Sequence, residues 1–335
     1  MSKSVLVIGA TGAMGRHLVP ELVKLGYEVT GVSLDEQKKP VPGVKYYVGD
    51  CFDKDFLAEL LAQKFDGIVN FMSFGKKHPW PEYMDMFLQN TDHYIFLSSC
   101  RVYADEEVPV RETSPRLLDV SKDEALLASY DYCMHKARAE DLMWASDYNN
   151  FTIVRPATTF SEMRYQLVTL EAKHTVGRAS KGKKVIVPIQ AKDKPATLCW
   201  GGDVAKMIAR LMFKPETLRE AYNVCSSESH TWGEIADYYK QLCGLEAVWV
   251  DKEDYLKVKE AEVTTASRWQ LEYARLFRRI TDNSKMLAVT GLKQSDFMTL
   301  YDALKMMIDA VPEGYVWEDT DTDVRMDKYL EEHGL

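Results

Sequence analysis

The chain has 335 residues, of which 46% are hydrophobic and 28% are charged, which is typical of a globular protein of about two domains. Its 51 acidic residues outnumber its 42 lysines and arginines, and the net charge of −9 argues against a nucleic-acid backbone as the main partner. The six cysteines are scattered without a Cys-x-x-Cys pair, so we expect reduced thiols and neither a disulfide framework nor a metal site. No signal peptide precedes the first predicted strand and no apolar run approaches about 18 residues, so we expect a cytoplasmic protein with no membrane partner.

The first strongly patterned stretch begins almost at the N-terminus. Val5–Ile8 predicts a buried parallel strand, and three glycines follow before an apolar pattern of helical period. In a strand–turn–helix unit, Gly9 permits the tight turn, Gly12 the approach of phosphates, and Gly15 the packing of helix on strand. Such glycines also occur in plain structural turns, but the flanking strand and helix favour a dinucleotide site. We expect the phosphates to lie against Gly9, Thr11, Gly12, Ala13, Met14 and Gly15.

The second predicted strand, 28–34, bears on the choice between NAD and NADP, because its end faces the adenosine ribose in nicotinamide-binding folds. The expected position is Ser33, which is neither an acid for the 2′-hydroxyl nor an arginine for a 2′-phosphate. Asp35 offers a carboxylate two residues later, while Lys38 and Lys39 offer positive charge. Both cofactors therefore stay open at this stage.

The next part of the chain continues the alternation of strands and helices. Strands are predicted over 44–50, 67–71, 94–99 and 151–156, with helices over 53–61, around 83–88, and from a capping-box pattern at Ser121–Glu124 towards Ser146. This order predicts an α/β fold with a doubly wound parallel Rossmann sheet in a dinucleotide-binding domain, residues 1–157.

Beyond residue 158 the pattern becomes mixed, so we expect a smaller substrate-binding region over 158–335 that returns some elements to the main sheet. Helices are predicted over 204–213, from the capping box Thr231–Glu234 to a point before Gly244, and over 297–310 with Ser295 as a candidate cap. The acidic tail from Val311 is expected to be either a mobile end or an oligomer contact, and a homodimer is one possible assembly.

Candidate catalytic residues lie on the predicted helix before 146. Tyr132 and Lys136 are four residues apart, so they share one helix face, and a nearby ammonium lowers the pKa of a phenol that starts near ~10. Such a tyrosine can exchange a proton with a substrate hydroxyl. Ser99, at the carboxyl end of a predicted strand, can donate to the same oxygen. The spacing also arises by chance, as at Tyr301/Lys305, but that pair lies far outside the α/β domain.

Several motifs together resemble the extended short-chain dehydrogenase/reductases, in particular their NAD-dependent epimerase/dehydratase branch. They are the glycine turn, Val48-Gly49-Asp50, Ser98-Ser99-x-x-Val102-Tyr103, Tyr132-x-x-x-Lys136, Arg155-Pro156, Gly202-Asp203-Val204-Ala205 and Asp282-Asn283-Ser284-Lys285, spanning roughly residues 4 to 310. The resemblance implies that Tyr132 is the acid/base, Lys136 its partner and a ligand of the nicotinamide ribose, and Ser99 the hydroxyl anchor. It also implies cofactor contacts at Asp50 and Cys51, which would flank the adenine, and at Phe71 and Pro156.

Two of the departures from this branch bear on the reaction and the substrate. Cys100-Arg101 stands where the sugar 4,6-dehydratases have an Asp-Glu pair, which argues against that reaction. The stretch 197–202 lacks the arginine that often binds the sugar-nucleotide diphosphate, leaving Arg278 or Arg279 as substrate-binding candidates; an exposed structural arginine is the alternative.

From these residues we expect an NAD(P)-dependent oxidoreductase or epimerase that acts on a secondary alcohol or ketone. The favoured substrate class is a sugar or nucleotide-sugar. One alternative is a one-way carbonyl reductase or alcohol dehydrogenase. Another is a cofactor-binding regulatory or RNA-associated protein without turnover, which the presence of Tyr132 and the net negative charge disfavour.

Overall fold

The computed structural model describes residues 2–335 and divides them into two compact units. Unit 1 comprises the chain up to Thr159 together with Cys199–Ser227 and Thr281–Phe297. Unit 2 comprises Phe160–Leu198, Glu228–Ile280 and Met298–Leu335. Two segments from the second half of the chain are therefore integral parts of unit 1.

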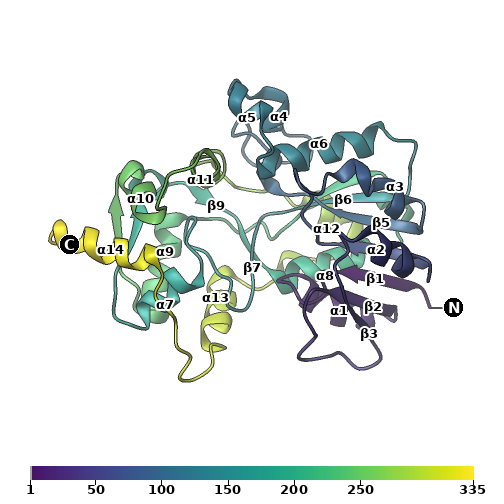
Figure 1. The fold of residues 1–335 in the computed structure, drawn as a ribbon, viewed down its shortest axis with the longest axis horizontal. Helices are drawn as coiled ribbons and strands as arrows, with labels where there is room; N and C mark the ends of the chain where they lie inside the picture. Colours follow the sequence, from purple (N-terminus) through teal and green to yellow (C-terminus); the bar gives the residue numbers. More distant parts are fainter. Residues whose placement is uncertain (1) are drawn as a thin grey trace. The chain divides into compact units, whose positions relative to one another are not determined.

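A seven-stranded parallel sheet forms the centre of unit 1, with the order β11-β6-β5-β4-β1-β2-β3 (Figure 1). This arrangement confirms the predicted doubly wound α/β fold. The strands are β1 Ser4–Ile8, β2 Glu28–Ser33, β3 Lys45–Val48, β4 Phe65–Asn70, β5 Thr91–Leu97, β6 Phe151–Pro156 and β11 Glu220–Val224.

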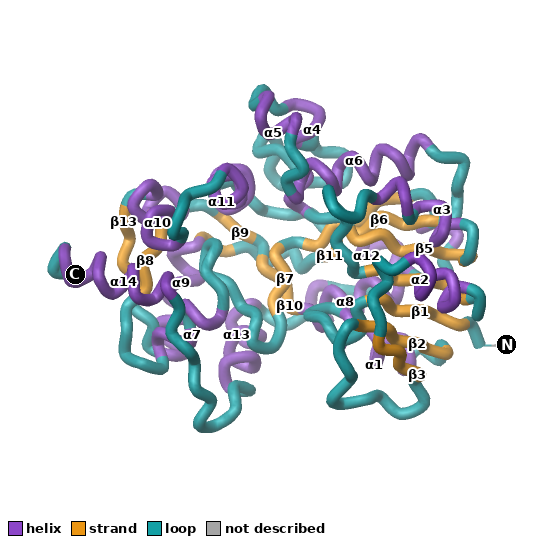
Figure 2. Tube along the Cα trace, viewed as in Figure 1, coloured by secondary structure: helices purple, strands orange, loops and turns teal. Residues whose placement is uncertain are grey.

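Helices cover both faces of this sheet, as the alternation of side chains in β1 requires. Val5 and Val7 join the apolar cluster that contains α1 and α8, whereas Leu6 and Ile8 join the cluster that contains α2 and α3 (Figures 1 and 2). The helices of unit 1 are α1 Gly15–Lys24, α2 Lys54–Leu61, α3 Met84–Leu88, α4 Leu117–Val120, α5 Glu124–Ala128, α6 Tyr132–Ala145, α8 Gly201–Leu211 and α12 Ser284–Thr290.

Local signals located most elements of unit 1 well, but the caps before α6 differ from the prediction. Ser121 does not begin a helix: its hydroxyl accepts from the backbone N–H of Asp123, and Asp123 itself caps the short helix α5. A break then separates α5 from α6, whose cap is Asp131. The capping-box prediction at Ser121–Glu124 was therefore wrong, because a nearer aspartate satisfies the helix N-terminus.

Unit 2 consists mainly of helices with two small two-stranded sheets, β8 with β13 and β9 with β12. The capping box at Thr231 is present as predicted, and Gly244 ends α9 in the left-handed conformation at φ +75°. The helix predicted at 297–310 begins instead at Leu300 with Thr299 as its cap, and it is not the last. The helices are α7 Val176–Ala179, α9 Trp232–Cys243, α10 Lys252–Lys259, α11 Thr265–Gln270, α13 Leu300–Asp309 and α14 Asp321–Glu332; the strands are β8 Val185–Pro188, β9 Pro195–Ala196, β12 His230–Thr231 and β13 Ala247–Val250.

The short strands β7 (Thr158–Phe160) and β10 (Leu198–Trp200) pair with each other. The acidic tail after Val311 includes α14, which ion pairs with the buried Arg178 hold within unit 2. Arg178, itself 1% exposed, contacts Asp323 at 3.3 Å and Asp327 at 2.6 Å. Within residues 2–335, every helix is too short or too polar to cross a membrane.

Candidate cofactor and catalytic site

The glycine turn after β1 has the geometry that a dinucleotide phosphate site needs. Gly9 has φ +82°, a backbone conformation that residues with a side chain rarely adopt. The N–H of Gly12 donates to the Gly9 carbonyl at 3.0 Å. A Cβ on Gly15 would lie 2.1 Å from the Gly9 oxygen, so the start of α1 packs directly on the end of β1. This close packing places the N-terminus of α1 beside the carboxyl end of β1, and a helix N-terminus in that place can bind an anion.

A cavity of about 240 Å³ lies beside the turn, at the carboxyl ends of β1, β2 and β4. It brings together five predicted cofactor residues, Gly9, Ser33, Asp50, Cys51 and Phe71. Its other lining residues were not predicted, although each follows or ends a parallel strand and that position was the available signal. They are Ile8, Val32, Leu34, Gly49, Phe52 and Met72.

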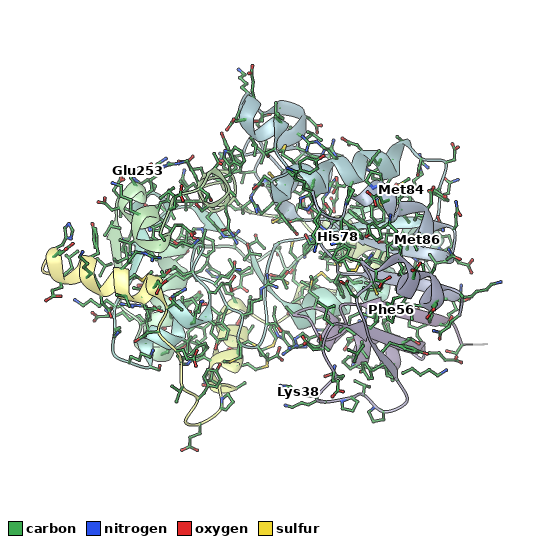
Figure 3. The ribbon with its side chains drawn as sticks, viewed as in Figure 1. Lys38, Phe56, His78, Met84, Met86 and Glu253 are labelled. Atoms are coloured by element: carbon green, nitrogen blue, oxygen red, sulfur yellow. The ribbon has the colours of Figure 1, made fainter. Side chains whose placement is uncertain are left out.

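Ser33 is committed to the protein rather than free to meet a ribose. Its hydroxyl accepts from the Thr11 N–H at 3.0 Å and donates to the Val32 carbonyl at 2.8 Å. Asp35 is exposed on the following loop, and so is Lys38, whose side chain extends from the loop between β2 and β3 (Figure 3). None of these groups fixes a charge at the ribose position.

Asp50 and Cys51 also line the cavity. The Asp50 carboxylate accepts from the Phe52 N–H at 2.9 Å, which shapes the turn after β3. Burial, with the nearby Asp50 charge, raises the pKa of Cys51 to about 12, so this group is a thiol at neutral pH. The Phe52 ring stacks on His78, labelled in Figure 3, with centroids 4.2 Å apart, which gives the cavity an aromatic wall.

Tyr132 is the first residue of α6, and Lys136 lies one turn later on the same face. The Lys136 Nζ atom is 5.7 Å from the centroid of the Tyr132 ring and donates to the Leu97 carbonyl at 2.6 Å. Lys136 is 1% exposed, and desolvation by burial lowers its pKa to about 7, against the opposing charge of Glu140. The ammonium is therefore held at the end of β5, next to the tyrosine.

Ser99 also lies beyond the end of β5, where it caps a 3-10 turn formed by Cys100–Val102. Its Oγ accepts from the Arg101 N–H at 3.2 Å. The neighbouring Ser98 hydroxyl is buried and has no hydrogen-bond partner among the described residues, 2–335. Two serine hydroxyls thus stand at the strand end that also receives Lys136.

A buried ion network holds α6 on the sheet. Glu140, one turn after Lys136, is fully buried and receives two hydrogen bonds from Arg155 of β6, at 2.9 and 2.6 Å. Arg155 also donates to the Tyr103 hydroxyl at 2.9 Å. Pro156, a predicted cofactor residue, is buried at the end of the same strand, in register with Val224 of β11. The network fixes the helix that carries Tyr132 and Lys136.

The two arginines predicted to bind substrate belong to unit 2, whereas the other predicted site residues belong to unit 1. Arg278 is exposed. Arg279 is 7% exposed, its guanidinium lies 5.0 Å from the centroid of Phe277, and its backbone N–H donates to Pro195 at 2.8 Å.

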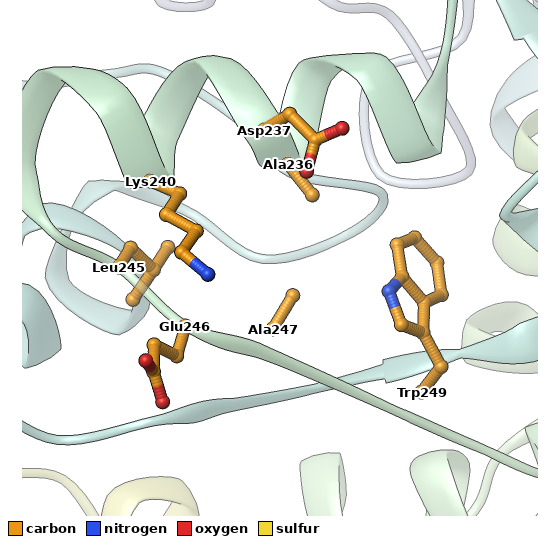
Figure 4. Close-up of a pocket in the computed structure, with 7 residues that line it drawn as sticks. All are labelled: Ala236, Asp237, Lys240, Leu245, Glu246, Ala247 and Trp249. Carbon is orange, nitrogen blue, oxygen red and sulfur yellow. The ribbon is translucent and has the colours of Figure 1, made fainter.

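Unit 2 also has a hollow of about 240 Å³ between α9 and β13 (Figure 4). Asp237 and Lys240 of α9 and Trp249 of β13 line it, together with Ala236, Leu245, Glu246 and Ala247. It contains none of the predicted site residues.

The parallel sheet, the glycine turn and the Tyr132/Lys136 helix define a dinucleotide-binding protein of the short-chain dehydrogenase/reductase type. The family model described as "NAD dependent epimerase/dehydratase family" matches residues 5–225. The chain belongs to this family, which confirms the predicted class of enzyme and agrees with the predicted nicotinamide cofactor.

Individual relatives are more distant. A UDP-glucose 4-epimerase of Lactobacillus helveticus is 30% identical over 132 residues, a match that covers 33% of this chain and 40% of the length of that enzyme. The crystal structure of a UDP-glucose 4-epimerase of Thermus thermophilus with NAD has a TM-score of 0.67 at 17% identity, covering 93% of this chain and 100% of that one. WbmG of Bordetella bronchiseptica, with NAD and UDP, has a TM-score of 0.59 at 16% identity, covering 100% of this chain and 96% of that one. At these identities the structures show the fold.

Proposed function

We propose that this protein is a nicotinamide-dependent epimerase or oxidoreductase acting on a secondary alcohol or ketone of a sugar or nucleotide-sugar, with Tyr132 as its acid/base. The observation that carries the proposal is the placement of Tyr132 beside the buried ammonium of Lys136, at the same sheet edge as Ser99. Ligands of parallel α/β sheets bind at this edge. The similarity to UDP-glucose 4-epimerases favours a nucleotide-sugar as the substrate class.

The glycine turn and its neighbouring cavity fit the proposed cofactor. Gly9 and Gly15 make a close approach of the backbone possible, and the cavity lined by Asp50, Cys51 and Phe71 has room for a flat ring beside the Phe52 wall. The cofactor, when bound, supplies a hydride acceptor and donor. In this proposal Ser33 holds the glycine turn through Thr11, and Arg278 or Arg279 is the candidate for binding the diphosphate of a nucleotide-sugar.

The chain's own residues perform the proton transfer. Ser99 would donate a hydrogen bond to the reacting oxygen, which orients it towards Tyr132. The phenolate of Tyr132 would accept the hydroxyl proton during oxidation and return it during reduction. The positive charge of Lys136 stabilises that phenolate. The hydrogen bond from Lys136 to the Leu97 carbonyl keeps the ammonium in place.

Turnover of a panel of nucleotide-sugars by three proteins tests the proposal. Tyr132→Phe removes one oxygen, so cofactor affinity should hardly change while turnover falls by about 10² to 10⁴. The matched control is Tyr301→Phe, because Lys305 has the same spacing but pairs with Asp309 on α13 and leaves Tyr301 packed on Tyr238. Full activity of Tyr132→Phe would contradict the mechanism. NAD retained through purification favours epimerisation, whereas an exchangeable cofactor favours one-way reduction.

A further inference from the structure

Arg101, which follows the Ser99 cap, is joined to the catalytic helix by its side chain. The 3-10 turn at Cys100–Val102 fixes the Arg101 backbone, because its N–H donates to the Ser99 hydroxyl. Its guanidinium contacts Asp131, with Nη2 3.1 Å from Oδ1. The two side chains are 14% and 5% exposed, so the ion pair is largely shielded from water and from screening ions.

Asp131 uses the same oxygen to cap α6. Oδ1 accepts from the N–H of Cys133 at 3.0 Å, which begins the helix one residue after Asp131, at Tyr132. The Arg101–Asp131 pair therefore anchors the residue that immediately precedes the proposed acid/base. A change at Arg101 reaches Tyr132 through this cap.

The guanidinium also lies against the tyrosine itself. The Arg101 Cζ atom is 5.3 Å from the centroid of the Tyr132 ring, within the range of a cation–π contact. Arg101 Nε is buried and has no hydrogen-bond partner in the part of the chain that the structure describes. A buried arginine that only supported the fold would be expected to use this donor, so an unused one next to Tyr132 indicates a role at the site.

From these contacts we infer that Arg101, held by Asp131, is a positioning residue for Tyr132: it orients the phenol at the start of α6 and supplies a positive charge that favours the phenolate. The inference rests on the proposed acid/base role of Tyr132. It assigns a function to the arginine in the Ser98-Ser99-Cys100-Arg101 stretch, where the motif of the sugar 4,6-dehydratases has a carboxylate.

The described contacts place four charged or titratable groups around Tyr132. Lys136 and His135 come from its own helix, Asp131 from the cap, and Arg101 from the 3-10 turn. Burial lowers the pKa of His135 to about 4, so it stays neutral while a phenol titrates. The Asp131 carboxylate contributes a negative charge, which its pair with Arg101 offsets. Burial lowers the pKa of Lys136 to about 7, so among these four groups Arg101 supplies the positive charge that persists while a phenol titrates.

Ultraviolet titration of tyrosinate in the protein saturated with NAD tests the inference without a known substrate. For the unmodified protein and for each arginine variant, the curve of the same protein carrying Tyr132→Phe is subtracted. The difference is the titration of Tyr132 alone. Arg101→Gln should raise the midpoint of this difference curve by about one pH unit, and Arg101→Lys should restore most of the shift. Arg138→Gln is the matched control, because Arg138 lies 6.0 Å from the ring of the neighbouring Tyr130 and should leave the Tyr132 midpoint unchanged.

An unchanged Tyr132 midpoint in Arg101→Gln would overturn the inference, and so would equal shifts in the Gln and Lys variants. If Arg101→Gln does not fold, Arg101→Met, which keeps the apolar stem of the side chain, takes its place in the titration. Failure of both variants to fold would assign Arg101 a structural role instead. The proposed function fails separately, when Tyr132→Phe keeps full turnover. A Tyr132→Phe protein without turnover, combined with an unmoved midpoint in Arg101→Gln, would leave the function standing and remove the role of Arg101.

Discussion

Replacing Lys136 by methionine should stabilise the cofactor-free protein at neutral pH. Lys136 is 1% exposed, and burial lowers its pKa from 10.5 to about 7. The unfolded chain therefore binds this proton more tightly than the folded chain between those values, and the burial of Lys136 costs stability below about pH 10. The difference of about 3.5 units (10.5 − 7) corresponds to roughly 5 kcal/mol below pH 7 and roughly 4 kcal/mol at pH 7.

Methionine keeps the unbranched stem of the side chain, one atom shorter, and removes this cost, but it cannot donate to the Leu97 carbonyl. Leaving that buried oxygen without its 2.6 Å hydrogen bond costs about 1–3 kcal/mol. The expected net gain at pH 7 is therefore about 1–3 kcal/mol. The gain should shrink as pH rises and change sign between about pH 8 and pH 10, because the cost of burying the charged lysine then falls below the cost of the lost hydrogen bond.

Urea unfolding of the cofactor-free proteins at several pH values between 6.5 and 10 measures this effect. Pulsed hydrogen exchange on peptides from β5 and α6 should report unit 1 separately, because two compact units need not unfold together. The reasoning would be refuted if the free energy of unfolding of Lys136→Met were lower than that of the parent protein at pH 7 and the difference did not depend on pH. Burial of the charged lysine would then not cost stability.

Other outcomes follow from the same site. Lys136→Met should lose both turnover and cofactor affinity, measured by steady-state kinetics and calorimetry, because the ammonium would serve phenolate and ribose alike. Gly12→Val should remain folded yet lose NAD and NADP binding in calorimetry, and unchanged affinity would contradict the phosphate site. Gly15→Ala should destabilise unit 1 by more than about 2 kcal/mol, because its Cβ would lie 2.1 Å from the Gly9 oxygen; an unaltered melting temperature would argue against that packing. NAD and NADP should differ less than about tenfold in affinity, since the Ser33 hydroxyl is occupied, and a hundredfold preference would implicate Asp35 or the nearby lysines.

The sequence alone determined the parts of this protein that short-range interactions specify. The apolar run Val5–Ile8 and the three glycines after it predicted a strand, a turn and a helix, and each is present because the apolar run, the glycine turn and the helical period are patterns of adjacent residues. The spacing of Tyr132 and Lys136 put both on one face of α6 for the same reason, since one helical turn separates them. The capping box at Thr231 was equally readable.

Only the tertiary structure decided what those local elements meet. β11 becomes the seventh strand because it pairs with β6, more than sixty residues earlier in the chain, and no local pattern encodes a partner at that distance. The carbonyl of Leu97 that holds Lys136, and the guanidinium of Arg101 beside Tyr132, reach α6 from the end of β5. Such contacts depend on how the sheet and its helices pack, so the sequence could predict the Tyr132/Lys136 pair but not the groups that contact it.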